Sequence, residues 1–183
     1  MLRKLPLSLN VGGKDYPIRT DYRDCLLILD AFNDPNLSWQ EQYMVMLQIL
    51  YKEVPDEEHL KEAIEKALWF LNLGEESSQV SSKPVFSWEQ DEQMIFAEVN
   101  KIAGREIRLD EYMHFWTFMG FFQCIGEGLF STVISIRQKL NSHKKLDKTE
   151  KEFYRKNKQL VDLKKRVSTA EQQSIDLINQ MYT

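Results

Sequence analysis

The sequence has three histidines, His59, His114 and His143, which are the first residues to test for metal chemistry. A zinc site needs several ligands at close spacing, and none of the three has a second histidine at such a spacing. Glu111 and His114 have the Glu-x-x-His spacing of carboxylate-bridged di-iron bundles, but that site needs a second copy of the motif, which is missing. We therefore expect no metal site and interpret His114 as a partly exposed or core-rim histidine.

The sequence also offers no motif for a catalytic nucleophile or for phosphate binding. The two cysteines, Cys25 and Cys124, lie far apart in apolar, helix-like patterns without a Cys-x-x-Cys pair, which predicts two reduced, buried thiols. The sequence contains neither a glycine-rich phosphate loop nor a Gly-x-Ser-x-Gly elbow. These observations predict a protein that is not an enzyme and that binds no cofactor.

Basic residues gather toward the C-terminus. Residues 141–166 contain ten Lys and Arg against four Asp and Glu, whereas residues 1–140 contain 14 against 22. This distribution predicts an acidic body with a basic arm. Such an arm could neutralise phosphates, so nucleic-acid binding is one alternative, but an acidic body repels nucleic acid and the same charges fit the solvated face of a helix. We expect no nucleic-acid partner.

The elements that would position a site are mainly helices. Alternating apolar and polar residues at 5–11 and 15–19, separated by two glycines, predict a β-hairpin. The serine-rich stretch at about residues 75–86 predicts an exposed linker between two helical halves. Helices are expected to begin after the following capping or turn residues: Thr20 or Asp21, Ser38, Asp56, Ser87, Asp110 and Gly128. Gly104 is expected to end the helix that follows Ser87.

Residues 115–136 contain a single formal charge, Glu127, and their length would permit a membrane span. A carboxylate near the middle of a span is costly, and glycines interrupt the segment, so we expect no membrane insertion. We expect instead a central helix, capped by Asp110, that is apolar nearly all round and forms the core of its half. The short N-terminal apolar run is interrupted by Pro6 and Asn10, which predicts a cytosolic rather than a secreted protein.

The C-terminal arm contains a heptad pattern. Asp147 is the predicted cap of a long, highly charged helix that extends toward residue 178. A polar residue, Ser174, breaks the pattern, so a coiled coil and a helix packed against its own body remain equal alternatives. The heptad positions are our predicted partner-binding or self-association residues: Leu160, Leu163, Val167, Ala170, Leu177 and Met181.

These patterns predict a mainly α fold with an N-terminal β-hairpin packed on a compact multi-helix domain and a long charged C-terminal helix. The expected division is a body over residues 1–140, with its linker at about 75–86, and a charged helical arm over residues 141–183.

Residues 86–137 resemble the bacteriophage "gene product fifteen" family of tailed phages and of prophages in Gram-positive bacteria. The resemblance rests on the run Trp88 to Asp91, on Ile95 to Ala97, on the aromatic run from His114 to Phe118 and on the closing Ile134 to Arg137. Phe115 stands where the family pattern has the first of two adjacent tryptophans. The signature residues expected in the core are Trp88, Asp91, Ile95, Phe115, Trp116, Phe118 and Arg137.

The resemblance implies a gene beside the tape-measure gene and a tail-assembly chaperone in the host cytoplasm. Such a chaperone coats the tape-measure protein and recruits tail-tube subunits. A minor structural tail protein that stays in the virion is the alternative. We expect the partner surface on residues 160–181 or in grooves between the helical halves, and we expect truncation of Trp88 or Trp116 to unfold the domain.

Overall fold

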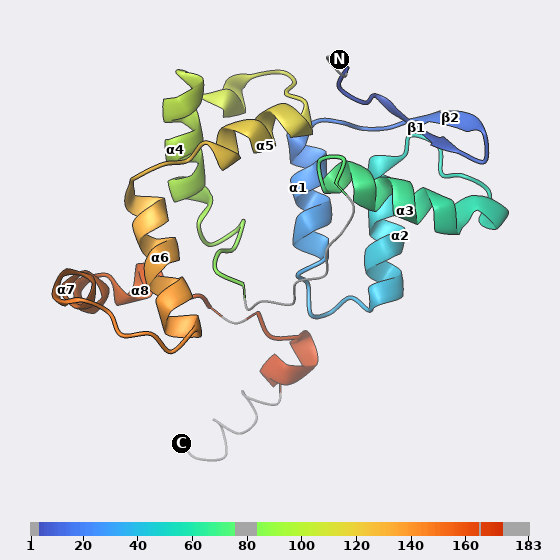
Figure 1. Ribbon diagram of the computed structural model, residues 1–183. Coiled ribbons are helices and arrows are strands. Elements are labelled where there is room, and N and C mark those ends of the chain that lie inside the picture. Colours follow the sequence, from blue (N-terminus) through green and yellow to red (C-terminus); the bar gives the residue numbers. More distant parts are fainter. Residues whose placement is uncertain (1–3, 76–83, 165, 174–183) are drawn as a thin grey trace. The chain divides into compact units, whose positions relative to one another are not determined.

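The computed structural model describes residues 4–75, 84–164 and 166–173, which fall into two compact units. Unit 1 takes its described residues from Met1–Ser77 and Lys165–Thr183, and unit 2 takes them from Ser78–Lys164. The chain therefore divides differently from the body and arm expected from composition: residues 141–164 group with the helices that precede them, because side-chain hydrogen bonds described below join them. The fold is mainly α with an N-terminal hairpin, as predicted (Figure 1).

Unit 1 begins with the predicted hairpin. Strands β1 (Ser8–Val11) and β2 (Lys14–Pro17) are antiparallel, with Leu9 opposite Tyr16. Gly12 and Gly13 form the turn with φ of 57° and 80°, a left-handed conformation that glycine adopts without steric cost. The second strand ends at Pro17, as expected for a residue that cannot donate to a ladder. Figure 1 shows the hairpin running along α3.

Three helices complete the described core of unit 1. Asp21 and Ser38 cap the first two helices as predicted, and Ser38 forms a capping box with Glu41. Asp56 is the N-cap of a short 3-10 turn ahead of the third helix and makes no side-chain cap bond to it. The helical bounds are α1 (Tyr22–Ala31), α2 (Trp39–Leu50), η1 (Glu57–His59) and α3 (Leu60–Leu71).

Unit 2 is helical throughout its described elements. Gly104 ends the first of them in a left-handed C-terminal cap with φ of 69°, as predicted from its position. The bounds are α4 (Glu92–Ala103), η2 (Ile107–Leu109), α5 (Phe115–Gln123), α6 (Leu129–Asn141), α7 (Lys148–Lys156) and α8 (Lys158–Val161).

Two helix starts in unit 2 differ from the sequence prediction. The helix expected after Ser87 begins only at Glu92, because Ser87 donates its N–H to Asp91 and accepts from the Gln90 N–H, which closes a turn ahead of the helix. The helix expected after Asp110 begins at Phe115, since Asp110 ends η2.

His114 is the N-cap of α5, and its position corrects an expectation. Its Nδ1 accepts from the Trp116 N–H at 3.0 Å, and its side chain is 4% exposed rather than at the core rim. The buried imidazole therefore has a structural role in starting the most aromatic helix of the chain.

Helix α5 is not buried on all sides. Phe115 and Phe118 are fully buried, whereas Trp116 and Met119 are only partly covered and the helix ends at Gln123. No helix in the described ranges is both long and apolar enough to cross a membrane. Cys124, expected to be buried, is exposed just past the end of α5.

The long C-terminal helix is a wrong prediction. Helix α7 ends at Lys156. Asn157 has a non-helical φ of −122° and separates α7 from the four-residue α8 (Figure 1). The Asn157 side chain donates to the carbonyl of Phe153, a local bond that competes with continued helix. Asp147 does cap α7, with a capping box to Glu150, as its sequence position predicts.

Candidate partner-binding site

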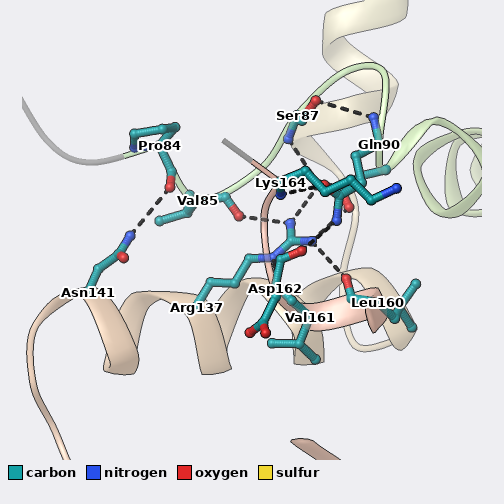
Figure 2. Close-up of polar contacts among 11 residues, drawn as sticks. Pro84, Val85, Ser87, Gln90, Arg137, Asn141, Leu160, Val161, Asp162 and Lys164 are labelled. Atoms are coloured by element: carbon teal, nitrogen blue, oxygen red, sulfur yellow. Dashed lines mark hydrogen bonds and ion pairs between the residues drawn. The ribbon is translucent and has the colours of Figure 1, made fainter. Parts of the chain in front are cut away.

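Arg137, on the inner face of α6, is the central polar residue of unit 2. A guanidinium has five N–H groups, and here every one of them has an acceptor. The Nε donates to the carbonyl of Val161 at 2.6 Å, and the two terminal nitrogens donate to the carbonyls of Val85 and Leu160 (Figure 2). One side chain on α6 therefore holds both the segment before α4 and the C-terminal end of α8.

Asp91 supplies the negative charge that balances this cation. Its two oxygens accept from Arg137 at 2.6 and 2.9 Å in a bidentate pair, and Oδ2 also accepts the Ser87 N–H. The side chains of Arg137 and Asp91 are 4% and 0% exposed, so the pair is shielded from solvent. Removing one partner would leave a buried, uncompensated charge, which costs about 3–5 kcal/mol.

Neighbouring polar bonds complete this arrangement, which we call the Arg137 node: Asp91, Arg137 and the segments they hold. The Gln90 amide donates to the carbonyl of Asp162 and accepts from the Lys164 N–H, so residues after α8 stay beside the start of α4 (Figure 2). Asn141 donates to the carbonyl of Pro84. The end of the predicted linker is therefore tied to the helical core of unit 2 rather than loose.

An aromatic cluster lies in unit 2 as well. Phe86 contacts Trp88, Phe122 and Phe130, with ring centroids 5.1, 5.6 and 6.2 Å apart. Trp88 lies 4.9 Å from Phe122 and 6.1 Å from Phe118. Packing of this kind adds stability beyond the area buried, so the cluster contributes to the core of unit 2.

Unit 1 contains a pocket between β1 and α3, with a volume of about 610 Å³, which is within the usual range for binding sites. One wall is formed by β1 and Pro6, and the other is the face of α3 and its C-terminal cap that Glu65, Leu68, Trp69 and Asn72 share at helical spacing. We call this feature the hairpin pocket. Its lining residues are Pro6, Ser8, Leu9, Asn10, Glu65, Lys66, Leu68, Trp69, Asn72 and Glu75.

Two contacts hold the hairpin turn against α3 beyond the end of this pocket. The N–H of Gly12 donates to Oε2 of Glu62 at 3.0 Å. A Cβ at Gly12 would lie 2.6 Å from the ring of His59, so this close approach needs glycine. Among the charged residues in the lining, Glu65 and Glu75 outnumber Lys66, which makes the pocket slightly acidic.

Comparison with known proteins decides the family. The family model for the bacteriophage Gp15 protein matches residues 1–163, which is most of the chain. The chain belongs to the bacteriophage Gp15 protein family. No curated protein and no solved structure matches it. The resemblance seen in residues 86–137 is confirmed, and the match takes in both the hairpin pocket and the Arg137 node.

The signature residues of this Gp15-family chain are not equally buried. Ile95, Phe115 and Phe118 are completely inaccessible to solvent. Trp88 and Trp116 are only half-buried, which corrects the expectation that they anchor the core. The two charged members, Asp91 and Arg137, form the ion pair of the node.

The predicted partner-binding residues do not form one stripe. The carbonyl of Leu160 accepts from Arg137, Leu163 follows α8 in non-helical chain, and Ala170 lies in a further helical turn that begins at Thr169. Leu177 and Met181 lie outside the described residues. Val167 and Ala170 also lie beyond the matched region of the Gp15 family.

No described group of His, Cys, Asp and Glu side chains could hold a metal ion. The Cys25 thiol is fully buried in unit 1, and this burial raises its pKa, which disfavours the reactive thiolate. Burial likewise raises the pKa of Tyr51, whose hydroxyl donates to the carbonyl of Ala63 at 2.9 Å.

Sequence reasoning placed Asp91 and Arg137 in the core through the family signature but did not pair them, and it missed the hairpin pocket, although each feature left a signal. Arg137 follows Phe130 and Val133 at helical spacing, so a cation on the apolar face of α6 indicated a buried partner. The hairpin pocket was signalled by a two-stranded hairpin, whose outer edges need cover, and by Trp69 on the nearby helix.

Proposed function

We propose that this phage protein is a tail-assembly chaperone that binds the tape-measure protein in the host cytoplasm and has no enzymatic activity. The observation that carries the proposal is the family match over residues 1–163. The tape-measure protein is long, helical and apolar, so it needs cover until the tail tube forms. A small, mainly helical protein fits that task.

Exposed apolar side chains in unit 1 support this proposal. Trp39, in the first turn of α2, is 64% exposed and rests edge-to-face on Tyr43 with ring centroids 6.0 Å apart. Leu27 on α1 is 59% exposed. Tryptophan is enriched among the residues that dominate protein–protein binding, and an apolar partner helix offers it suitable contacts.

Basic side chains of the arm are partly neutralised within the chain, which favours a protein partner over nucleic acid. Arg166 pairs with Asp30 at 2.7 Å, and Lys156 pairs with Glu152 at 2.8 Å. Tail-tube subunits and a second copy of the chain are further partners that the proposal includes.

Co-expression with the tape-measure protein of the same phage tests the proposal. We expect the two proteins to copurify and the soluble fraction of the tape-measure protein to rise. Trp39→Ser should reduce that rise, whereas Gln40→Ser, at an exposed neighbour, should not. An unchanged soluble fraction with the parent protein would contradict the proposal. Mass spectrometry of purified particles provides a second test, because a chaperone is absent there and a structural tail protein is present.

A further inference from the structure

We infer that the hairpin pocket binds an extended segment of another polypeptide, which adds to the outer edge of β1 as a third strand. The segment has an aliphatic side chain and, two positions away, a lysine or arginine. This inference goes beyond the proposed function, because it specifies a binding mode and does not depend on which protein supplies the segment.

The hairpin register shows which main-chain groups of β1 face outward. Ile18 donates its N–H to the carbonyl of Leu7 at 3.0 Å, and Leu9 lies opposite Tyr16. Hydrogen-bonded and non-hydrogen-bonded pairs alternate along an antiparallel ladder, so Leu9 and Val11 bond to β2. The N–H and C=O groups of Ser8 and Asn10 therefore point away from β2. In the described part of the chain no strand pairs with them, since the sheet consists of β1 and β2 alone.

The two edges of this hairpin differ in their cover. Along β2 the outer edge meets the end of α2, where Lys52 donates to the carbonyl of Pro17 at 3.1 Å and Ile18 bridges Tyr51. Along β1 the outer edge lies in the hairpin pocket, which both Ser8 and Asn10 line. An open edge beside a pocket is the arrangement that strand addition uses, with main-chain bonds giving affinity and the pocket giving specificity.

The wall of α3 sets the chemistry of the segment. Leu68 and Trp69 form the apolar part of that wall, and Glu65 lies one turn before them on the same face. Side chains of a strand alternate between its two faces. Residues two positions apart therefore share a face, and one aliphatic side chain directed at Leu68 and Trp69 would leave a basic side chain two positions away near Glu65 or Glu75.

The test starts with a displayed library of random eight-residue peptides selected against the full chain, followed by binding measurements with the selected peptides in synthetic form. We expect binders in which an aliphatic residue stands near a lysine or arginine. Asn10→Pro removes one outward N–H and should weaken their binding about fivefold, since one such bond contributes about 1 kcal/mol.

Asp15→Pro is the matched control. It removes an outward N–H from the opposite edge and loses the same Asn10–Asp15 side-chain bond, so it should leave binding unchanged. Glu65→Lys, on the exposed side of α3, should weaken binding about fivefold, and Glu57→Lys in η1 should have no effect. These charge variants keep the test decisive if a proline variant fails to fold.

Amide hydrogen exchange gives a readout specific to strand addition. Saturation with a selected peptide should slow exchange at Ser8 and Asn10 and leave Asp15 unchanged. The inference is overturned by a library without binders, by binders indifferent to both Asn10→Pro and Glu65→Lys, or by unchanged exchange at Ser8 and Asn10. A concentration-dependent dimer that Asn10→Pro abolishes would also overturn it, because the occupant would then be a second copy.

Discussion

The two units join segments that are distant in sequence by different means. In unit 1 main-chain groups share the connection with the Arg19 side chain. Ile18 bridges Tyr51, the Arg19 N–H donates to the carbonyl of Leu50 at 2.7 Å, and the Arg19 guanidinium donates to carbonyls at the end of α2. In unit 2 a single side chain, Arg137, donates to three carbonyls and one carboxylate. Hydrogen bonds between main-chain groups remain after most substitutions, whereas the hydrogen bonds of a side chain are lost when that residue is replaced. Sensitivity to mutation should therefore be spread through unit 1 and concentrated in unit 2.

The largest expected effect tests this contrast at the Arg137 node. Arg137→Ala leaves the Asp91 carboxylate buried without a counter-charge and frees three carbonyls, so we expect the free energy of unfolding to fall by about 3–5 kcal/mol. Urea denaturation followed by circular dichroism measures the loss. The double variant Asp91→Leu with Arg137→Met should lose less than Arg137→Ala, because no isolated charge remains. If Arg137→Ala has the same free energy of unfolding as the parent protein, the proposed contrast between the two units is wrong.

Truncation of aromatic residues separates the core of unit 2 from its partly covered side chains. Phe118→Ala empties a fully buried position and should cost about 3–5 kcal/mol. Trp88→Ala should cost less, because the indole is only partly buried and its neighbours can adjust. Chemical denaturation of both variants gives the order, and an equal or larger loss for Trp88→Ala would show that the cluster around Phe86 supports the unit.

A smaller effect is expected from a buried hydrogen bond in unit 1. Tyr51→Phe removes the donor to the Ala63 carbonyl and should cost about 1 kcal/mol, because main-chain bonds at the same residue remain. Tyr43→Phe is a control that keeps the ring contacts with Phe32 and Trp39. A loss for Tyr51→Phe as large as that for Arg137→Ala would contradict the spread of stabilising contacts in unit 1.

The smallest expected effect concerns acid stability. Hydrogen bonds from Arg108, and to a lesser degree from Asn100, lower the pKa of the Glu106 carboxyl to about 2. A carboxyl whose pKa is lower in the folded than in the unfolded state contributes stability above its ordinary value of 4.5, and that contribution is lost as the pH falls toward 2. Glu106→Gln should therefore flatten part of the decline in melting temperature over this range, as measured by scanning calorimetry. If the slope of melting temperature against pH is unchanged, other carboxyl groups cause the loss of stability in acid.

The sequence by itself determined most of the local structure. Glycines at positions 12 and 13, the Ser38 capping box and Gly104 each predicted an element end that the structure confirms. These features depend on bonds and torsion angles within a few residues, so the sequence contains all the information they need. The family was readable for a related reason, since its signature lies in one short stretch.

Only the tertiary structure decided which residues meet. Arg137 and Asp91 are 46 positions apart, and Ser8 and Trp69 line one pocket from opposite ends of unit 1. The charged C-terminal stretch reads as one long helix, but Asn157 ends α7 and the segment after α8 is held by Gln90 and Arg137 instead. Helix propensity is worth tenths of a kcal/mol per residue, roughly, and several well-placed hydrogen bonds to the neighbouring helices outweigh it. Such contacts depend on where the other helices lie, which no local pattern specifies.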